Sequence, residues 1–130
     1  MGKYAYVEER TGFGLPRDGR TRREDIPRLL DLTADDDPKV RAVAAKNLCP
    51  CHVKGDLPEV WERLYEMLHD PDARVRRDAV HALADGSPRE RADEIAAALY
   101  QLRNDPERGI RRNVARVLRE YRRTGRVNVL

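Results

Sequence analysis

Apolar residues recur along most of the chain at steps of three and four, with charged residues between them. One series consists of Val60, Leu64, Met67 and Leu68. The next consists of Val75, Ala79, Ala82 and Leu83. Because an α-helix turns once every 3.6 residues, each series places its apolar side chains on one face. The pattern predicts two amphipathic helices that bury their apolar faces together.

This helical pair occurs three times, because the sequence matches itself when it is shifted by 35 residues. The aligned leucines are Leu29, Leu64 and Leu99, and then Leu48, Leu83 and Leu118. The aligned charged positions are Asp35, Asp70 and Asp105, each followed six residues later by Arg41, Arg76 or Arg111. Such agreement at one spacing indicates internal repeats. We place them at about residues 24–53, 54–87 and 88–123, with a C-terminal tail at 124–130.

The turn between the two helices of a repeat contains Asp and Pro, as in Asp70-Pro71 and Asp105-Pro106. We expect this Asp to cap the second helix and this Pro to occupy its first turn. In the first repeat the proline comes two places later, at Pro38. The second helix of that repeat is therefore predicted to begin late.

A single helical hairpin cannot bury its own apolar stripe, whereas stacked hairpins bury it against each other. The sequence therefore predicts an all-α fold, a right-handed α-solenoid of three antiparallel hairpins. Three aromatic residues of the first helices, Trp61, Tyr65 and Tyr100, occupy apolar positions of the repeat. We expect all three to pack in the core.

The pattern resembles the HEAT repeat, in the short form found in bacteria. The resemblance covers residues 24–123 and rests on the turn Asp and on the Arg that follows a Val or Ile six residues later. It implies a ladder between neighbouring repeats, made by the aspartates and arginines aligned above. It also implies that the second helices line a concave surface.

The two ends of the chain lie outside the repeats. Residues 1–23 form an N-terminal extension that contains four glycines and a proline, so we expect it to be partly irregular. Within it, residues 3–8 (KYAYVE) have the composition of a weak strand, and residues 126–130 (RVNVL) are also β-prone. The two ends are expected to pair with each other or to bind a partner, unless the N-terminal residues are disordered.

Charged residues make up 38% of the 130 residues, which suits an elongated fold with much exposed surface. No apolar run is long enough to span a bilayer, and the first ten residues lack the apolar core of a secretion signal. We therefore expect a cytoplasmic protein without a membrane partner and with reduced cysteines.

Charge is distributed unevenly between the helices, although the net charge is only +3. The first helices are acidic and the second helices are basic. Outside the core positions, the basic residues of the second helices are Lys39, Lys46, Arg74, Arg77, His81, Arg108, Arg112, Arg116 and Arg119. The resemblance places this stripe on the concave surface, and its charge favours an anionic ligand.

Three functions are compatible with these residues. The first is a non-enzymatic scaffold that binds a protein partner through the basic stripe. The second is a nucleic-acid binder that uses the same residues against phosphates, with an affinity that falls steeply with salt. No nucleophile–base pair or carboxylate pair in a pocket supports an enzyme, and no cofactor is expected. The sequence gives neither the partner nor the oligomeric state.

The third function is a metal or redox role for the segment Cys49-Pro50-Cys51-His52. Zinc in structural sites takes four ligands, and this segment offers three. A fourth ligand would come from His69 or His81. The ligand set is incomplete, so we interpret the segment first as a turn between repeats in which Pro50 ends a helix, Cys49 packs at the edge of the core and His52 meets the last carbonyls of that helix.

Overall fold

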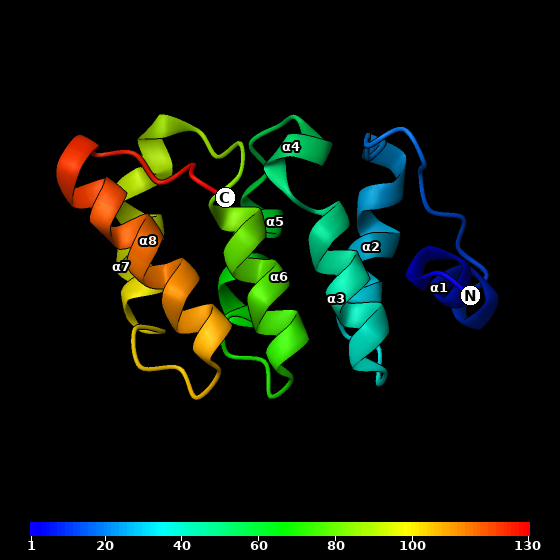
Figure 1. Cartoon of the computed structure of the whole chain (residues 1–130). Coiled ribbons are helices and arrows are strands. Elements are labelled where there is room, and N and C mark those ends of the chain that lie inside the picture. The colour runs from blue at the N-terminus through cyan, green and yellow to red at the C-terminus, as the bar shows by residue number, and fades with distance from the viewer.

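The computed structural model describes residues 1–130 as a stack of helices without any β-strand (Figure 1). The helices are α1 (Lys3–Thr11), η1 (Arg23–Asp25), α2 (Ile26–Leu32), α3 (Pro38–Asn47), α4 (Pro50–Val53), α5 (Pro58–Met67), α6 (Ala73–Leu83), η2 (Arg89–Arg91), α7 (Ala92–Tyr100) and α8 (Arg108–Thr124). The predicted all-α solenoid is confirmed. The helices α2–α3, α5–α6 and α7–α8 form its three hairpins.

The hairpins stack so that the helices form two layers. In Figure 1, the second helices α3, α6 and α8 lie side by side in front of the first helices α2, α5 and α7. Neighbouring hairpins contact each other mainly through their second helices. In a curved stack the inner layer is packed more closely than the outer one. The second helices therefore form the inner layer, in agreement with the family resemblance.

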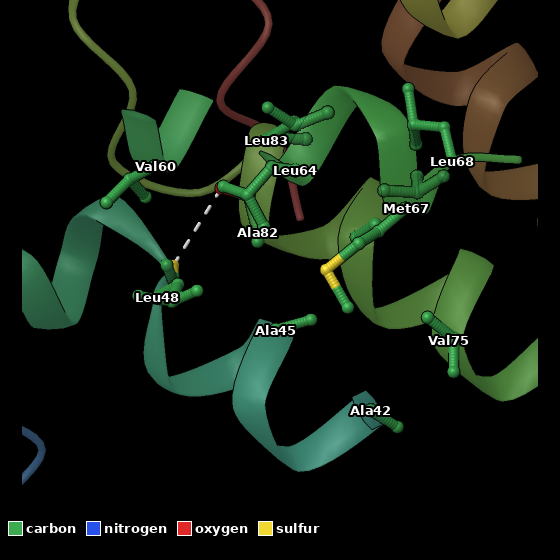
Figure 2. Close-up of a cluster of buried hydrophobic side chains, with 14 of the residues drawn as sticks. Ala42, Ala45, Leu48, Val60, Leu64, Met67, Leu68, Val75, Ala82 and Leu83 are labelled. Carbon is green, nitrogen blue, oxygen red and sulfur yellow. Dashed lines mark hydrogen bonds between the residues drawn. The ribbon is translucent and has the colours of Figure 1, made fainter. Parts of the chain in front are cut away.

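One continuous apolar core runs between the two layers and through all three hairpins. Leu64, Leu83 and Met67 of the middle hairpin are essentially inaccessible to solvent, and Figure 2 shows them beside Leu48 and Ala45 of the first hairpin. Deleting such a leucine side chain typically costs about 2–5 kcal/mol. The core therefore joins the repeats into one cooperative unit.

The three aromatic residues of the first helices differ in burial. Trp61 is buried, and Tyr65 is half-buried, with its hydroxyl donating to Glu94 of the next hairpin at 2.6 Å. Tyr100 is 53% exposed, so the prediction that it lies in the core was wrong. The physical reason is its place in the last hairpin, where no following hairpin covers it.

The second helices begin at equivalent positions, Pro38, Ala73 and Arg108. Three predictions were therefore wrong. The second helix of the first repeat does not start late, and the Asp of the Asp-Pro pair is not the cap. Pro71 and Pro106 precede the N-cap residues and do not lie in the first helical turn. The caps are Asp37, Asp72 and Glu107, two residues further on, whose side chains accept from backbone amides of the first helical turn. The aligned Asp instead accepts from the amide of the cap residue, as Asp70 does from Asp72 at 2.8 Å, and this shapes the turn before the helix.

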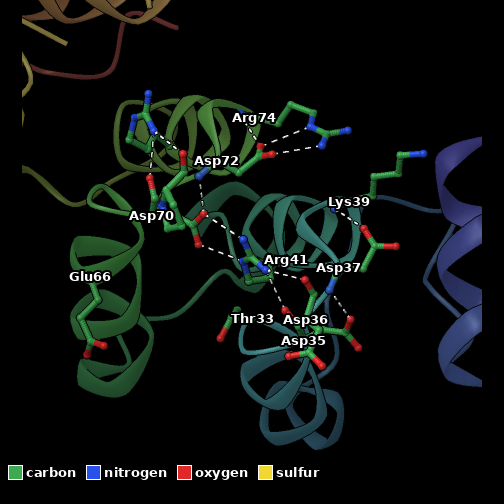
Figure 3. Close-up of polar contacts among 12 residues, drawn as sticks. Thr33, Asp35, Asp36, Asp37, Lys39, Arg41, Glu66, Asp70, Asp72 and Arg74 are labelled. Atoms are coloured by element: carbon green, nitrogen blue, oxygen red, sulfur yellow. Dashed lines mark hydrogen bonds and ion pairs between the residues drawn. The ribbon is translucent and has the colours of Figure 1, made fainter. Parts of the chain in front are cut away.

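The aligned Asp and Arg side chains contact each other between neighbouring hairpins. Arg41 donates two hydrogen bonds to Asp70, at 2.9 and 3.1 Å, and a further two to the carbonyls of Asp35 and Asp36 (Figure 3). Arg76 binds Asp105 in the same two-pronged way, at 2.8 and 3.1 Å. Each arginine thus holds the turn of its own repeat and the turn of the next.

The last repeat has the arginine of the ladder without a following aspartate. Arg111 donates to the carbonyls of Asp105 and Pro106, at 2.6 and 3.0 Å, and makes no side-chain ion pair. At the other end of the stack, Arg10 of α1 binds Asp35 at 3.2 Å. Arg10 therefore takes the position that an arginine of a preceding repeat would occupy.

Acid should weaken the fold through Asp105. Burial favours the neutral form of this carboxyl, but hydrogen bonds from Arg76 and from the Glu107 amide outweigh it and lower its pKa. A carboxyl with a lowered pKa in the folded state stabilises the fold above its unfolded pKa, about 3.9, and loses this contribution as pH falls through the folded value. Urea denaturation at pH 7, 4 and 3 measures the free energy of unfolding. Asp105→Asn should lower this free energy most at pH 7, and at pH 3 the variant should be nearly as stable as the unmodified chain. A cost that is independent of pH would contradict this assignment.

The N-terminal extension is more ordered than its composition indicates. Residues 3–8 lie in the helix α1, so the prediction of a weak strand was wrong. The buried side chain of Val7 attaches α1 to the core, and the hydroxyl of Tyr6 donates to Asp37 at the start of α3. Helix formation uses the apolar face that packs against α3, and this tertiary contact overrides local β propensity.

The C-terminal tail does not pair with the N-terminus. It turns back after Gly125 and lies along the middle and last hairpins, where Val127 is buried (Figure 1). Asn128 exchanges two hydrogen bonds with the backbone of Ser87, at 2.8 and 2.9 Å. The amide of Leu130 donates to the carbonyl of Ala84. The tail therefore fastens the last inter-repeat turn.

Candidate functional site

The nine basic residues of the predicted stripe all lie on the inner layer, and all are exposed. They are Lys39 and Lys46 of α3, Arg74, Arg77 and His81 of α6, and Arg108, Arg112, Arg116 and Arg119 of α8. We call their common surface the inner basic surface. It spans all three hairpins because the 35-residue repeat returns these positions to the same side of each second helix.

Most of this positive charge is not neutralised within the molecule. Among the nine residues only Arg74 and His81 take part in ion pairs, with Asp72 at 3.0 Å and with Asp85 at 3.5 Å. The four arginines of α8 take part in none. Guanidinium groups that have no internal partner retain their donors for an external carboxylate or phosphate.

The helix α1 covers the α3 end of the inner basic surface. The ammonium groups of Lys39 and Lys46 lie over the rings of Tyr6 and Tyr4, at 5.1 and 6.0 Å from the ring centres. These tyrosines were not predicted to lie there, because α1 has no counterpart in the repeats. The open part of the surface is consequently the part formed by α6 and α8.

One carboxyl interrupts the positive charge. Asp78 of α6 occupies the repeat position of Val43 and Asn113 and is half-buried. Burial raises its pKa, while the nearby charges of Lys3 and Arg77 act in the opposite direction. The repeat alignment places Asp78 beside Arg77 and one helical turn before His81. Asp78 was not predicted, because only basic residues were considered for this surface.

A pocket of about 340 Å³ opens between α1, α3 and α6. Its cations are Lys3, Lys39, Arg74 and Arg77, beside the carboxyl of Asp78, and Met1, Tyr6, Ala42 and Val43 contribute an apolar part. Such a pocket combines donors for an anion with a small apolar wall. That combination fits an acidic side chain and its apolar neighbour in a polypeptide.

The segment Cys49-Pro50-Cys51-His52 joins the first hairpin to the second. Helix α3 ends at Asn47, and Pro50 begins the four-residue helix α4, so the prediction that Pro50 ends a helix was wrong. Cys49 is 2% exposed, and burial is the main cause that raises its pKa. Its packing at the edge of the core agrees with the sequence interpretation.

His52 does not meet the carbonyls of a helix end, as had been expected. Its Nδ1 is buried without a hydrogen-bond partner, and burial lowers its pKa. His52 lines a second pocket, of about 260 Å³, together with Cys49, Cys51, His81 and Asp85. His69 does not line this pocket, so of the two proposed additional ligands only His81 lies beside the cysteines.

Residues 26–119 match the family model for HEAT repeats. The chain belongs to the HEAT-repeat family. The matched residues include all three hairpins except the last five residues of α8, and every Asp and Arg of the ladder. No curated protein and no solved structure matches the chain.

HEAT repeats generally serve as scaffolds for protein interaction and are typically not enzymes. Their stacked hairpins offer an extended surface without requiring a buried catalytic pocket. In this HEAT-repeat chain none of the helices combines the length and the apolar character that crossing a bilayer requires.

Proposed function

We propose that this HEAT-repeat chain is a non-enzymatic scaffold that binds an acidic segment of another protein along its inner basic surface. The observation that carries the proposal is the row of arginines on α8, Arg108, Arg112, Arg116 and Arg119, which have no internal partners. Such a row is complementary to carboxylates spaced along a polypeptide. Binding by this surface would use Arg77 and His81 of α6 as well.

The pocket beside α1 favours a polypeptide over a nucleic acid. Its apolar part at Ala42 and Val43 suits a small hydrophobic side chain that follows an acidic one. Single-stranded nucleic acids are instead held by aromatic platforms on which bases stack. Tyr4 and Tyr6 are engaged with the lysines of α3 and with Asn47 and Asp37.

Site-specific photo-crosslinking tests this choice in cells. A photoreactive amino acid at position 112 on α8 should yield a discrete adduct with one protein, because the side chain faces the bound segment. The matched control places it at Ala97, an exposed residue of the outer helix α7, and should yield no such adduct. An adduct at position 112 that nuclease treatment removes would instead establish a nucleic acid as the ligand and overturn the proposal.

A further inference from the structure

The pocket at the start of the second hairpin brings together two thiols, two carboxyls and two imidazoles. Of these groups the proposed scaffold function uses only His81. The Sγ atoms of Cys49 and Cys51 lie 2.7 Å apart, and the carboxylate of Asp85 completes a group whose ligand atoms all lie within 4.8 Å of one another. His81 reaches the same carboxylate, with Nε2 3.5 Å from Oδ2. We propose that Cys49, Cys51, Asp85 and His81 bind a Zn²⁺ ion.

The ligand atoms of Cys49, Cys51 and Asp85 already lie close to the spacing around a tetrahedral ion. His81 lies outside this group of three and must approach the two sulfurs, and its side chain is 52% exposed and therefore free to rotate. With bonds of 2.0–2.3 Å, two ligands of one Zn²⁺ ion lie roughly 3.3–3.8 Å apart. The Sγ of Cys49 is 3.9 Å from Oδ2 of Asp85, and His81 is 3.5 Å from that oxygen, so these pairs need almost no movement. The two sulfurs must separate by about 1 Å. Cys51 is only half-buried at the pocket wall, so rotation of its side chain can provide this movement.

Three parts of the chain position these ligands, namely α4 with its N-cap, α6, and the turn that follows α6. Cys49 is the N-cap of α4, Cys51 lies within α4, and His81 lies on α6, one helical turn before Asp85. The turn that carries Asp85 packs closely against α4. Gly86 has φ +81°, and a Cβ atom at this position would be 3.1 Å from the amide nitrogen of Cys51. This close approach keeps Asp85 beside the two thiols.

The ligand chemistry favours zinc over the hard divalent cations. Two thiolates with an imidazole and a carboxylate suit Zn²⁺, whereas Mg²⁺ and Ca²⁺ prefer oxygen ligands. Three anionic ligands on one Zn²⁺ ion leave a net negative charge of one. Lys3 and Lys46 line the same pocket and offset that charge.

The test is the zinc content of the full chain, purified under reducing conditions without chelator, together with titration of the reduced apoprotein with Zn²⁺ and Co²⁺. We expect one Zn²⁺ ion per chain and, with Co²⁺, the ultraviolet charge-transfer band of thiolate ligands. Cys51→Ser and Asp85→Asn should each weaken zinc binding by about 100-fold or more, because each removes a ligand. Cys51 is chosen because it is less buried than Cys49, so its replacement is better tolerated by the fold.

Asp78→Asn is the matched control for Asp85→Asn, because both remove one carboxylate from the wall of the same pocket. It should leave the zinc affinity within a few-fold of that of the unmodified chain. Circular dichroism of each variant verifies that it is folded. Absence of stoichiometric binding, or unchanged binding by Cys51→Ser, would overturn the proposal.

Discussion

Replacing Arg76 by Ala should destabilise the chain by about 3 kcal/mol, because it leaves a buried carboxylate without its partner. The side chain of Asp105 is 3% exposed and that of Arg76 is 13% exposed, so this ion pair is largely shielded from water. The same change also removes the donors to the carbonyls of Asp70 and Pro71. Denaturation with urea, followed by circular dichroism, measures the loss.

The repeat provides a matched control for this prediction. Arg111→Ala is the same substitution at the equivalent position of the last repeat, where no aspartate follows. It removes only the hydrogen bonds to the carbonyls of Asp105 and Pro106, so we expect a loss of about 1 kcal/mol. If Arg111→Ala costs as much as Arg76→Ala, the ion pair between repeats does not provide the stability assigned to it.

The architecture could be predicted from the sequence because it is repeated. Three aligned copies separate the positions that must be apolar, such as Leu64, from those that vary, such as Asp78. The same alignment placed Asp70 in the register of Asp35 and Arg76 in that of Arg41, and the structure places the side chains of Arg41 and Asp70 in contact. This contact between residues 29 positions apart was expected from the resemblance to HEAT repeats, and the alignment showed which residues form it.

Features that occur once were not predictable in this way. The helix α1 has no second copy, and its local composition favours a strand, whereas its packing against α3 makes it a helix. Tyr100 is exposed because it lies in the last hairpin of the stack. Its alignment with Tyr65 does not show this difference, since the two residues share one repeat position. The choice of Asp72 rather than Asp70 as the helix cap depends on backbone angles in the turn that no spacing rule fixes.

The candidate site was predicted in part. The positions of the nine basic residues followed from the repeat, whereas the pockets depend on α1 and on the turn at Asp85, which lie outside the repeated pattern. The segment Cys49-Pro50-Cys51-His52 contains three residues that can bind a metal ion. Its neighbours Asp85 and His81 come from the next repeat and were brought beside it by the stacking of α4 on α6.

Reversing charge on α8 should abolish partner binding. Arg112→Glu with Arg116→Glu places two carboxylates where the acidic segment is proposed to lie, and like charges at such an interface cost several kcal/mol. This corresponds to a loss of affinity of roughly 100-fold or more. Both side chains are exposed and form no ion pair within the chain, so the fold should be retained.

The central claim is tested most directly by measuring the affinity of the crosslinked protein, once purified, for three forms of the chain. These are the unmodified chain, the double variant Arg112→Glu with Arg116→Glu, and a control with Arg20→Glu and Arg89→Glu, which makes the same charge change at exposed positions away from the second helices. The account predicts that only the α8 double variant loses binding, and that the affinity of the unmodified chain falls as salt is raised. Equal losses in the two double variants, or binding that survives the α8 change, would contradict it.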